Sequence, residues 1–432
     1  MKQYLLGTGI GARIAYMVGL VGCATMGYAQ YAIAPTVGDG SEDNPYQFTE
    51  IGHFAWLSEV CNVDGNATRN VYYKVKNDIN ASSTGQWNDE GTTTGTMEGF
   101  TPIGTAENPF MGHFIGSSYK MTGLSIERAD TDYVGLFGYT LGAEVKDFGV
   151  VNRNVIGSHY VGTLIGYNNQ STFVNCWTSA DVAGHDFVGG LVGYEYKTEM
   201  NNCFSTSKVD GNNYVGGLVG WNDTSIISQS YSTGAARSSA IEDTTMIGGL
   251  VGYNSPDSNI VGSHSIAEID AVSATHVGGL VGMNDGVISN CYYAQNTVHG
   301  AFDTGAIAGI NNTSGYIMNT MVSNNAEVVG KENTGGLLGE NKGIINSSMV
   351  NATSSIIGTS VTGGAIGMNS GYVMTTEVFA PVVGVNDIGG FVGISNGGIS
   401  LSGANGNVEA TSNAGGFAAV LEMGTVENCY AL

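Results

Sequence analysis

The sequence predicts an all-β protein, a parallel β-helix solenoid of about eleven coils that follows an N-terminal capping region. Three observations lead to this prediction. A Gly-Gly-aliphatic-aliphatic-Gly block recurs every 26 to 32 residues from about residue 131 to the C-terminus. Short apolar patches with alternating polarity follow the blocks, as β-strands require. The chain has 67 glycines but only 6 prolines, so the glycines belong to ordered structure and not to linkers.

The block marks the repeat unit of the predicted solenoid. Its eleven copies occupy residues 134–138, 161–166, 188–193, 215–220, 247–252, 277–282, 305–309, 334–339, 362–367, 388–393 and 414–419. A unit of this length is too short for a propeller blade of about 40 to 45 residues. A helical repeat is excluded as well, because each paired glycine would cost about 1 kcal/mol inside a helix. In a β-helix, glycine permits positive φ at corners and lets neighbouring chains approach where a Cβ would clash.

Two further strands complete each unit and make it a three-sided coil. About ten residues after a block, a small residue precedes an aromatic one, as in Cys176-Trp177 and Ser230-Tyr231. A third run with period-2 alternation follows, for example at residues 207–210. Asparagine follows many blocks, where it suits a left-handed corner and can also stack into a hydrogen-bonded ladder between coils. These asparagines are Asn168, Asn222, Asn254, Asn284, Asn341 and Asn369.

Residues 1–29 are predicted to be an export signal. A short apolar stretch at 14–22 follows positive charge and is too short to span a bilayer. Gly27-Tyr28-Ala29 fits the small-x-small rule for cleavage before Gln30, which we favour. Alternatively, Leu20-Val21-Gly22-Cys23 resembles a bacterial lipobox, in which Cys23 would carry a lipid and provide the chain's one membrane attachment. Either route predicts a secreted protein or one on the outer cell surface.

Residues 38–130 are predicted to form the cap and the first turns of the β-helix, and residues 131–432 the repeats. Thr49 is expected to cap a short helix that covers the open end of the solenoid. Its apolar residues, which fall on one side, are Ile51, Phe54, Leu57 and Cys61. Residues 427–432 begin another coil and stop inside it, which predicts either a truncated chain or an end covered by a partner.

At the level of residues, the blocks resemble the GLUG motif, a repeat of bacterial surface adhesins and of regions beside some immunoglobulin A peptidases. The segments before the repeats, 39–46, 102–104, 109–114 and 121–124, match what precedes this motif, so the resemblance covers roughly residues 38–432. It implies a right-handed β-helix that is secreted or on the cell surface, but no reaction. The peptidase signature His-Glu-x-x-His is absent from the sequence, so peptidase activity is not carried over.

Composition argues against several classes of function. Lys and Arg total 14 against 37 Asp and Glu, a formal charge of −23, so nucleic acid is not an expected partner. The seven histidines are at least twelve positions apart, and we assign no metal site and no cofactor. A polysaccharide lyase or hydrolase is the alternative, with Asp130 and Asp132 or Asp181 and Asp186 as the nearest carboxylate pairs. Such a pair must lie about 5 to 9.5 Å apart on one face.

The repeated small and aromatic positions supply the remaining candidates. Cys176 and Cys203 lie one coil apart, within disulfide reach at about 4.8 Å, but stacked free thiols are the expectation because Ser230 takes the same position. The aromatic residues after the small position are either internal packing or a platform on which a ligand stacks. They are Trp177, Phe204, Tyr231 and Tyr292.

The leading functional hypothesis is a non-enzymatic adhesin or scaffold that makes repeated weak contacts with glycans or surface proteins. A passive stalk that spaces another domain from the membrane is a further alternative.

Overall fold

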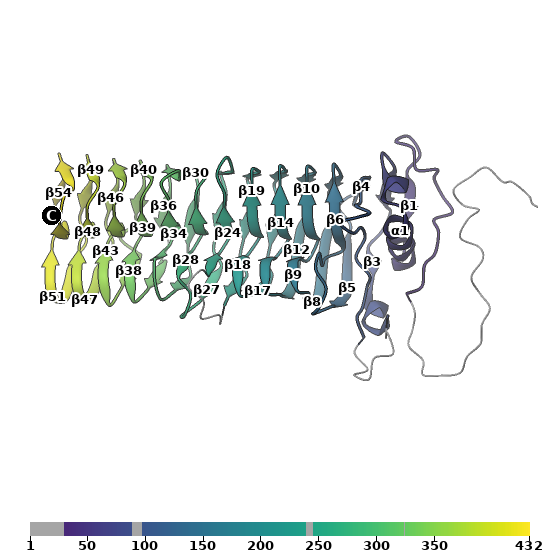
Figure 1. Ribbon diagram of the computed structural model, residues 1–432, viewed down its shortest axis with the longest axis horizontal. Coiled ribbons are helices and arrows are strands. Elements are labelled where there is room, and N and C mark those ends of the chain that lie inside the picture. The colour runs from purple at the N-terminus through teal and green to yellow at the C-terminus, as the bar shows by residue number, and fades with distance from the viewer. Residues whose placement is uncertain (1–29, 89–96, 239–244, 324) are drawn as a thin grey trace, which may run out of the picture.

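The computed structural model of the protein describes residues 30–88, 97–238, 245–323 and 325–432. These residues form a long rod of stacked coils in which strand arrows repeat side by side from the N-terminal cap to the C-terminus (Figure 1). The predicted parallel β-helix is therefore confirmed. The predicted export signal, including Cys23, lies outside the described residues. None of the described helices is long and apolar enough to cross a membrane.

The repeat blocks build one eleven-stranded parallel sheet, with one strand for each block found in the sequence. Its strands are β6 (Phe137–Leu141), β10 (Ile165–Asn169), β14 (Val192–Tyr196), β19 (Val219–Asp223), β24 (Val251–Asn254), β29 (Val281–Asn284), β34 (Ala308–Asn311), β39 (Leu338–Asn341), β44 (Ile366–Asn369), β48 (Val392–Ser395) and β52 (Ala418–Leu421).

A second parallel sheet has 14 strands, because it extends beyond the blocks into the N-terminal region. Its strands are β1 (Tyr46–Phe48), β2 (Tyr72–Val75), β4 (His113–Ile115), β7 (Glu144–Lys146), β11 (Thr172–Val174), β15 (Glu199–Asn201), β20 (Ile226–Ser228), β25 (Asn259–Val261), β30 (Val287–Ser289), β35 (Tyr316–Met318), β40 (Ile344–Asn346), β45 (Tyr372–Met374), β49 (Gly398–Ser400) and β53 (Thr425–Glu427).

The third sheet has 29 short strands, because most coils contribute two or three strands to it. In the N-terminal half they are β3 (Ile79–Asn80), β5 (Lys120–Glu127), β8 (Gly149–Ile156), β9 (His159–Gly162), β12 (Trp177–Ala183), β13 (Asp186–Gly189), β16 (Phe204–Ser205), β17 (Lys208–Asp210), β18 (Asn213–Gly216), β21 (Tyr231–Ser232), β22 (Ala235–Arg237), β23 (Met246–Gly248), β26 (His264–Ser265), β27 (Glu268–Asp270) and β28 (His276–Gly278). In the C-terminal half they are β31 (Tyr292–Ala294), β32 (Thr297–His299), β33 (Thr304–Gly305), β36 (Met321–Ser323), β37 (Glu327–Val329), β38 (Glu332–Gly335), β41 (Met349–Val350), β42 (Ser355–Ile357), β43 (Ser360–Gly363), β46 (Glu377–Val378), β47 (Val382–Gly389), β50 (Gly403–Ala404), β51 (Val408–Gly415) and β54 (Tyr430–Ala431).

The aliphatic residues of each block fill the interior of a coil. In the block at 188–193, Val188, Leu191 and Val192 are fully buried. Equivalent residues pair in register with the next coil, as Val192 does with Val219. The core is thus continuous along the rod, as expected when each repeat buries its apolar face against its neighbours.

The block glycines are required for close approach and not for positive φ. A Cβ on Gly189 would lie 2.0 Å from the carbonyl oxygen of Val192, and one on Gly190 would lie 2.2 Å from that of Gly217. The expectation that these glycines sit in left-handed corners is wrong. The left-handed residue is one that precedes the block. It is aromatic in the first coils, with φ of 58° at both Tyr160 and Phe187, and not aromatic in later ones, as at Val361 with φ of 50°.

The predicted asparagine ladder is confirmed from Asn222 to Asn369, with Asn311 as an additional member. Asn168, also predicted, lies outside it: its Oδ1 accepts from Thr140 and its Nδ2 has no partner among the described residues. Within the ladder, each Nδ2 donates to Oδ1 one coil further on, at 2.7 Å from Asn222 to Asn254 and from Asn254 to Asn284, 2.8 Å from Asn284 to Asn311, and 2.9 Å from Asn311 to Asn341 and from Asn341 to Asn369. These asparagines lie within strands, so their predicted left-handed conformation is wrong. Other asparagines, Asn175 and Asn202, hold the left-handed corner instead, with φ of 55° and 51°.

The N-terminal region contains the one α-helix of the described chain, α1 (Ile51–Val63), and the 3₁₀ helices η2 (Gly65–Thr68) and η3 (Ser82–Gln86). As expected, Phe54, Leu57 and Cys61 are fully buried, and Ile51 packs partly buried against the same core. Thr49 is not the helix cap. The capping position is Glu50, whose side chain makes no capping hydrogen bond.

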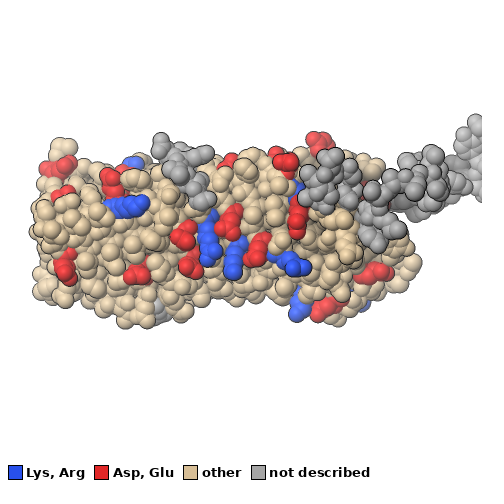
Figure 2. All heavy atoms as spheres, turned by 90° about the horizontal axis from the view of Figure 1, so that it is seen from below, with Lys and Arg blue, Asp and Glu red and all other residues tan. Residues whose placement is uncertain are grey.

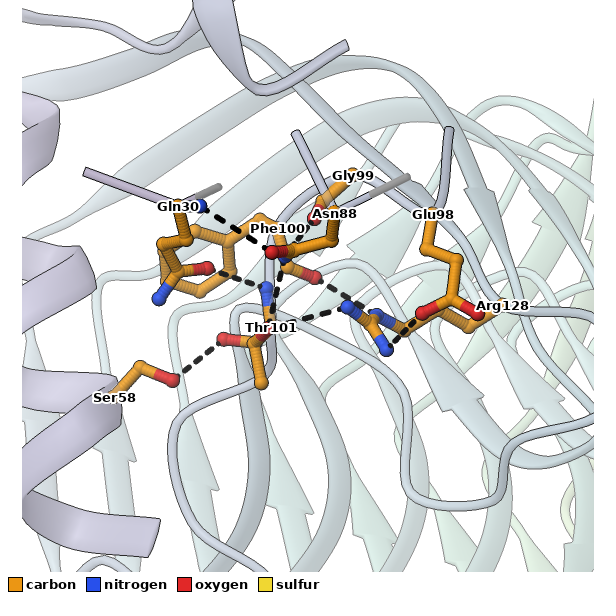
Figure 3. A network of polar contacts seen from close by, with 8 residues as sticks. All are labelled: Gln30, Ser58, Asn88, Glu98, Gly99, Phe100, Thr101 and Arg128. Atoms are coloured by element: carbon orange, nitrogen blue, oxygen red, sulfur yellow. Dashed lines mark hydrogen bonds and ion pairs between the residues drawn. The ribbon is translucent and has the colours of Figure 1, made fainter. Parts of the chain in front are cut away.

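A polar network ties this cap to the solenoid (Figure 3). Arg128, which follows β5, forms an ion pair with Glu98 at 2.7 Å and donates to the Phe100 carbonyl at 3.2 Å. The Thr101 backbone links the network to Ser58 of α1, whose hydroxyl donates to the Thr101 carbonyl at 2.8 Å. The helix, the loop before β4 and the first strands are therefore fixed to one another.

Candidate functional site

The four predicted stacking aromatics lie in one column along the third sheet. Trp177 and Phe204 have ring centroids 5.8 Å apart, and Phe204 and Tyr231 are 4.8 Å apart. His264, which was not predicted, fills the gap between Tyr231 and Tyr292, with ring centroids 4.9 Å and 4.5 Å away. All four pairs are parallel to within 9°. The column forms because parallel in-register strands place equivalent side chains one above another.

This geometry restricts which ring faces a ligand could reach. Phe204, Tyr231 and His264 each have a ring on both sides. Trp177 is covered on its other side by the backbone, because a Cβ on Gly149 would lie 2.2 Å from Cε2 of Trp177. Tyr292 is the last ring of the column, and among the described residues it stacks on one ring only, that of His264.

The other face of Tyr292 turns towards the next coil, where Met321 replaces the aromatic residue. Tyr292 pairs in register with Met321, and Met321 with Met349. A hollow of about 350 Å³ lies here. Its lining consists of Asn290, Cys291, Tyr292, Asn319, Thr320, Met321, Ser347 and Met349, none of which is charged. The hollow therefore combines an aromatic face with amide and hydroxyl groups.

The cysteines beside this column are free thiols. Cys176 and Cys203 are fully buried and unbonded, and the Cys176 N–H donates to Sγ of Cys203 at 3.4 Å. Burial, together with the neighbouring Cys176 thiol, raises the pKa of the Cys203 thiol. These thiols are packing residues and not reactive groups.

A second aromatic array was missed by the sequence analysis. It consists of two columns that flank the blocks on the N-terminal half of the rod. The column before the blocks contains Tyr133, Tyr160, Phe187 and Tyr214, and the column after them contains Tyr139, Tyr167, Tyr194, Trp221 and Tyr253. We call these nine residues the double ring ladder. The signal was present in the sequence, because an aromatic residue immediately precedes or follows several consecutive blocks.

The two columns of the double ring ladder interlock. Rings within the first column stack at 4.7 to 4.9 Å, and rings of opposite columns meet edge to face, as Tyr160 and Tyr194 do at 5.8 Å. The Tyr194 hydroxyl donates to Asp223 at 2.6 Å, and the Tyr253 hydroxyl donates to Asp285 at 3.0 Å. Burial raises the pKa of both phenols, and the nearby carboxylates raise it further. With ring faces used for internal packing, the ladder is a structural feature.

Asp181 and Asp186, one of the two carboxylate pairs predicted for an enzyme, lie on different strands and so in different columns of stacked side chains. Asp181 on β12 lies opposite Lys208, whereas Asp186 on β13 lies opposite His159, with Nδ1 3.3 Å from the Asp186 carboxylate. Asp130 and Asp132 are exposed before the first block, and Asp132 accepts a hydrogen bond from the His159 backbone. No group of three metal-binding side chains occurs in the part of the chain that the structure describes.

Charged side chains alternate in sign on the face shown in Figure 2. The strand register sets Arg237 between Asp210 and Asp270, and an ion pair joins Arg237 to Glu268 at 4.0 Å. Charges on this part of the rod are therefore compensated locally, and no patch of single sign results.

Comparison with known proteins gives a family-model match and two relatives. The family model of the GLUG motif matches residues 211–237. Halomucin of Haloquadratum walsbyi is 32% identical over 152 residues, which are 34% of this chain and 2% of that protein. A protein of Evansella cellulosilytica, described as a Gly-rich membrane protein, is 34% identical over 101 residues, 23% of this chain and 10% of that protein. The chain thus spans only a small part of these relatives.

One solved structure also resembles the chain. A crystal structure from Bacteroides ovatus, described as an immunoglobulin A1 protease, aligns with 60% of this chain and 77% of its own chain, at 21% identity and a TM-score of 0.48.

The matched GLUG residues extend from just before β18 to the end of β22, which is one complete turn of the solenoid. The repeat at 211–237 is a GLUG motif, and one copy of the motif builds one coil.

Proposed function

We propose that this protein is a non-enzymatic adhesin or scaffold of the cell surface that binds neutral glycans. The names of the relatives, a halomucin and a membrane protein, support a place at the cell surface. A rigid rod of similar coils suits a scaffold, and several copies of the chain on one surface would make contacts that are weak singly strong together. The hollow beside Tyr292 carries the proposal, because the column of rings ends there and the lining joins an aromatic side chain to amide and hydroxyl groups.

The chemistry of the hollow favours a sugar ring. Sugar rings present apolar C–H faces that pack on aromatic rings and hydroxyl groups that hydrogen-bond to amides. Tyr292 supplies the aromatic face, and Asn290 and Asn319 supply amide groups. Met321 is partly exposed at 36% and flexible, so it can move to admit a ring. The uncharged lining favours a neutral sugar over a uronic acid, whose carboxylate would find no cationic partner there.

A glycan array with the full chain tests this proposal. Neutral oligosaccharides should bind, and Tyr292→Ala should weaken binding by about tenfold or more, because the stacking surface is lost. The matched control is Tyr372→Ala, since Tyr372 is 68% exposed on β45 and has no ring contact among the described residues. Equal binding by both variants, or binding of acidic glycans alone, would contradict the assignment of the site.

The passive stalk is the competing function, and the same array separates the two. A stalk would bind no glycan in wild-type form. A polysaccharide-processing enzyme would release reducing ends from an acidic polysaccharide. The positions of Asp181 and Asp186 on different strands do not favour that reaction.

A further inference from the structure

The asparagine ladder follows a strict donor rule along the rod. At each step from Asn222 to Asn369, the Nδ2 of one coil donates to the Oδ1 of the next. Each side chain in the ladder must therefore donate one hydrogen bond to the next coil and accept one from the coil before it. Buried amides satisfy this rule at each position, because Asn carries both kinds of group.

Glu195 breaks the run of amides at one position. It lies on β14, in register between Asn168 on β10 and Asn222 on β19, and it is fully buried. Its Oε2 accepts a hydrogen bond from Thr198 Oγ1 at 3.2 Å. An ionised carboxylate has no proton to donate, so it cannot supply the forward donor that the ladder rule requires.

Three buried polar atoms without a partner mark this interruption. They are Nδ2 of Asn168, Oε1 of Glu195 and Oδ1 of Asn222. The first is a donor that lacks an acceptor, and the last is an acceptor that lacks a donor. A hydroxyl at Oε1 could accept from Asn168 and donate to Asn222, which would satisfy all three groups at once.

The surroundings of Glu195 contain no compensating charge. Its neighbours on β10 and β19 are neutral amides, and Thr198 is neutral. The ionisable group that interacts with it across the core is the Cys203 thiol, whose own pKa burial raises, so that thiol also stays neutral. No lysine, arginine or histidine in the described part of the chain is paired with Glu195.

We propose that Glu195 is a protonated carboxylic acid in the folded protein, that it replaces an asparagine in the ladder, and that its ionisation interrupts the ladder between Asn168 and Asn222. Burial, the dominant cause, raises the pKa of Glu195 from 4.5 to about 8. Between pH 4.5 and about 8, the folded protein therefore holds a proton on Glu195 that the unfolded chain has released. Stability therefore falls as pH rises from the unfolded to the folded pKa.

Infrared spectroscopy of the full chain tests the protonation directly. A carbonyl stretching band of a protonated carboxylic acid should be present at neutral pH and disappear as pH rises through about 8. Glu195→Gln should lack this band. Absence of the band from the wild type at pH 6 would overturn the proposal, whether or not the variant folds.

Thermal unfolding across pH gives a second, independent readout. The melting temperature of the wild type relative to Glu195→Gln should fall progressively from about pH 5 to pH 8, because the glutamine cannot ionise. Glu98→Gln is a matched control, since Glu98 is partly exposed in an ion pair at the cap and should not reproduce the effect. Parallel curves for wild type and Glu195→Gln would overturn the proposal. Stabilisation of the wild type, but not the variant, by added Ca²⁺ would also overturn it, because an ionised, cation-bound Glu195 would be indicated.

Discussion

Tyr160 and Tyr167 stand at the two ends of one repeat block, and their rings meet edge to face at 5.5 Å with an interplanar angle of 68°. Tyr160 reaches this position only with a φ of 58°, a left-handed conformation that costs a bulky residue about 1 to 2 kcal/mol. The ring contacts at this corner offset that cost. The same left-handed conformation occurs without a ring at Val361 (φ 50°) and Asn413 (φ 48°), so the rings stabilise this corner but do not create it.

Replacement of a ring inside the ladder should destabilise the protein markedly. Tyr160→Ala removes stacking on Tyr133 and Phe187 and edge contacts with the opposite column. We expect a loss of about 2 to 4 kcal/mol in the free energy of unfolding, measured by urea denaturation. Tyr372→Ala, at a 68% exposed position, should cost less than about 0.5 kcal/mol. Equal losses for both variants would show that the ladder contributes nothing beyond ordinary surface contacts.

The first glycine of the block pair should tolerate no side chain. It is glycine in every coil from Gly162 to Gly415, whereas Thr163 and Ala306 occupy the second position. A Cβ on Gly216 would lie 1.9 Å from the carbonyl oxygen of Val219 and 2.9 Å from the backbone nitrogen of Gly252 in the next coil, so Gly216→Ala must displace backbone atoms. The expected loss exceeds about 3 kcal/mol, larger than the usual effect of a single substitution. Gly85→Ala is the control, because its Cβ would have its nearest contact at an ordinary 3.8 Å. Circular dichroism during urea titration measures both, and similar midpoints would contradict the close-approach argument.

The fold was predictable because one block recurs in every coil, so the spacing of the blocks gives the length of a solenoid repeat. Eleven blocks correspond to an eleven-stranded sheet, and the asparagines after them do form a ladder. The conformation of individual corners was not predictable from propensity. Tyr160 takes the left-handed position that glycine was expected to hold, because the glycine is needed where two backbones nearly touch.

The candidate site was predictable only in part, for a similar reason. Register placed Phe204 and Tyr231 one above the other, as their equal positions in the repeat require. Sequence could not tell which face stays uncovered, because that depends on the residue in the next coil. Met321 after Tyr292 ends the run of rings, and a hollow lies there. His264 was not predicted because histidine does not match the Phe, Trp or Tyr found at this position in other coils. Its imidazole ring nevertheless continues the stack.

The ladder amides should be far more sensitive than surface amides. Asn284→Ala leaves the Nδ2 donor of Asn254 and the Oδ1 acceptor of Asn311 without partners in the core. Two unsatisfied buried groups should cost about 2 to 6 kcal/mol in unfolding free energy. Asn259→Ala, at a partly exposed outer position of β25, should cost less than about 1 kcal/mol. Asn284→Leu refines the test, since it fills the space but restores no hydrogen bond, and full recovery of stability by it would assign the loss to packing alone.

The cap should open locally when its polar network is cut. Arg128 connects Glu98, the Phe100 carbonyl and Thr101 Oγ1, and its side chain is only 11% exposed. Arg128→Ala leaves buried acceptors unpaired, so hydrogen exchange in residues 97–101 should accelerate by about tenfold or more, while the coils beyond β10 keep wild-type protection.

This locality follows from the solenoid, in which each coil contacts mainly its neighbours. Arg69→Ala provides the comparison, because Arg69 makes an exposed side-chain contact with Asn66 at 3.3 Å and should leave exchange in 97–101 unchanged. Acceleration spread evenly along the whole rod would mean that the cap and the coils unfold as one unit. In that case the network of Figure 3 would hold the entire fold and not only its end.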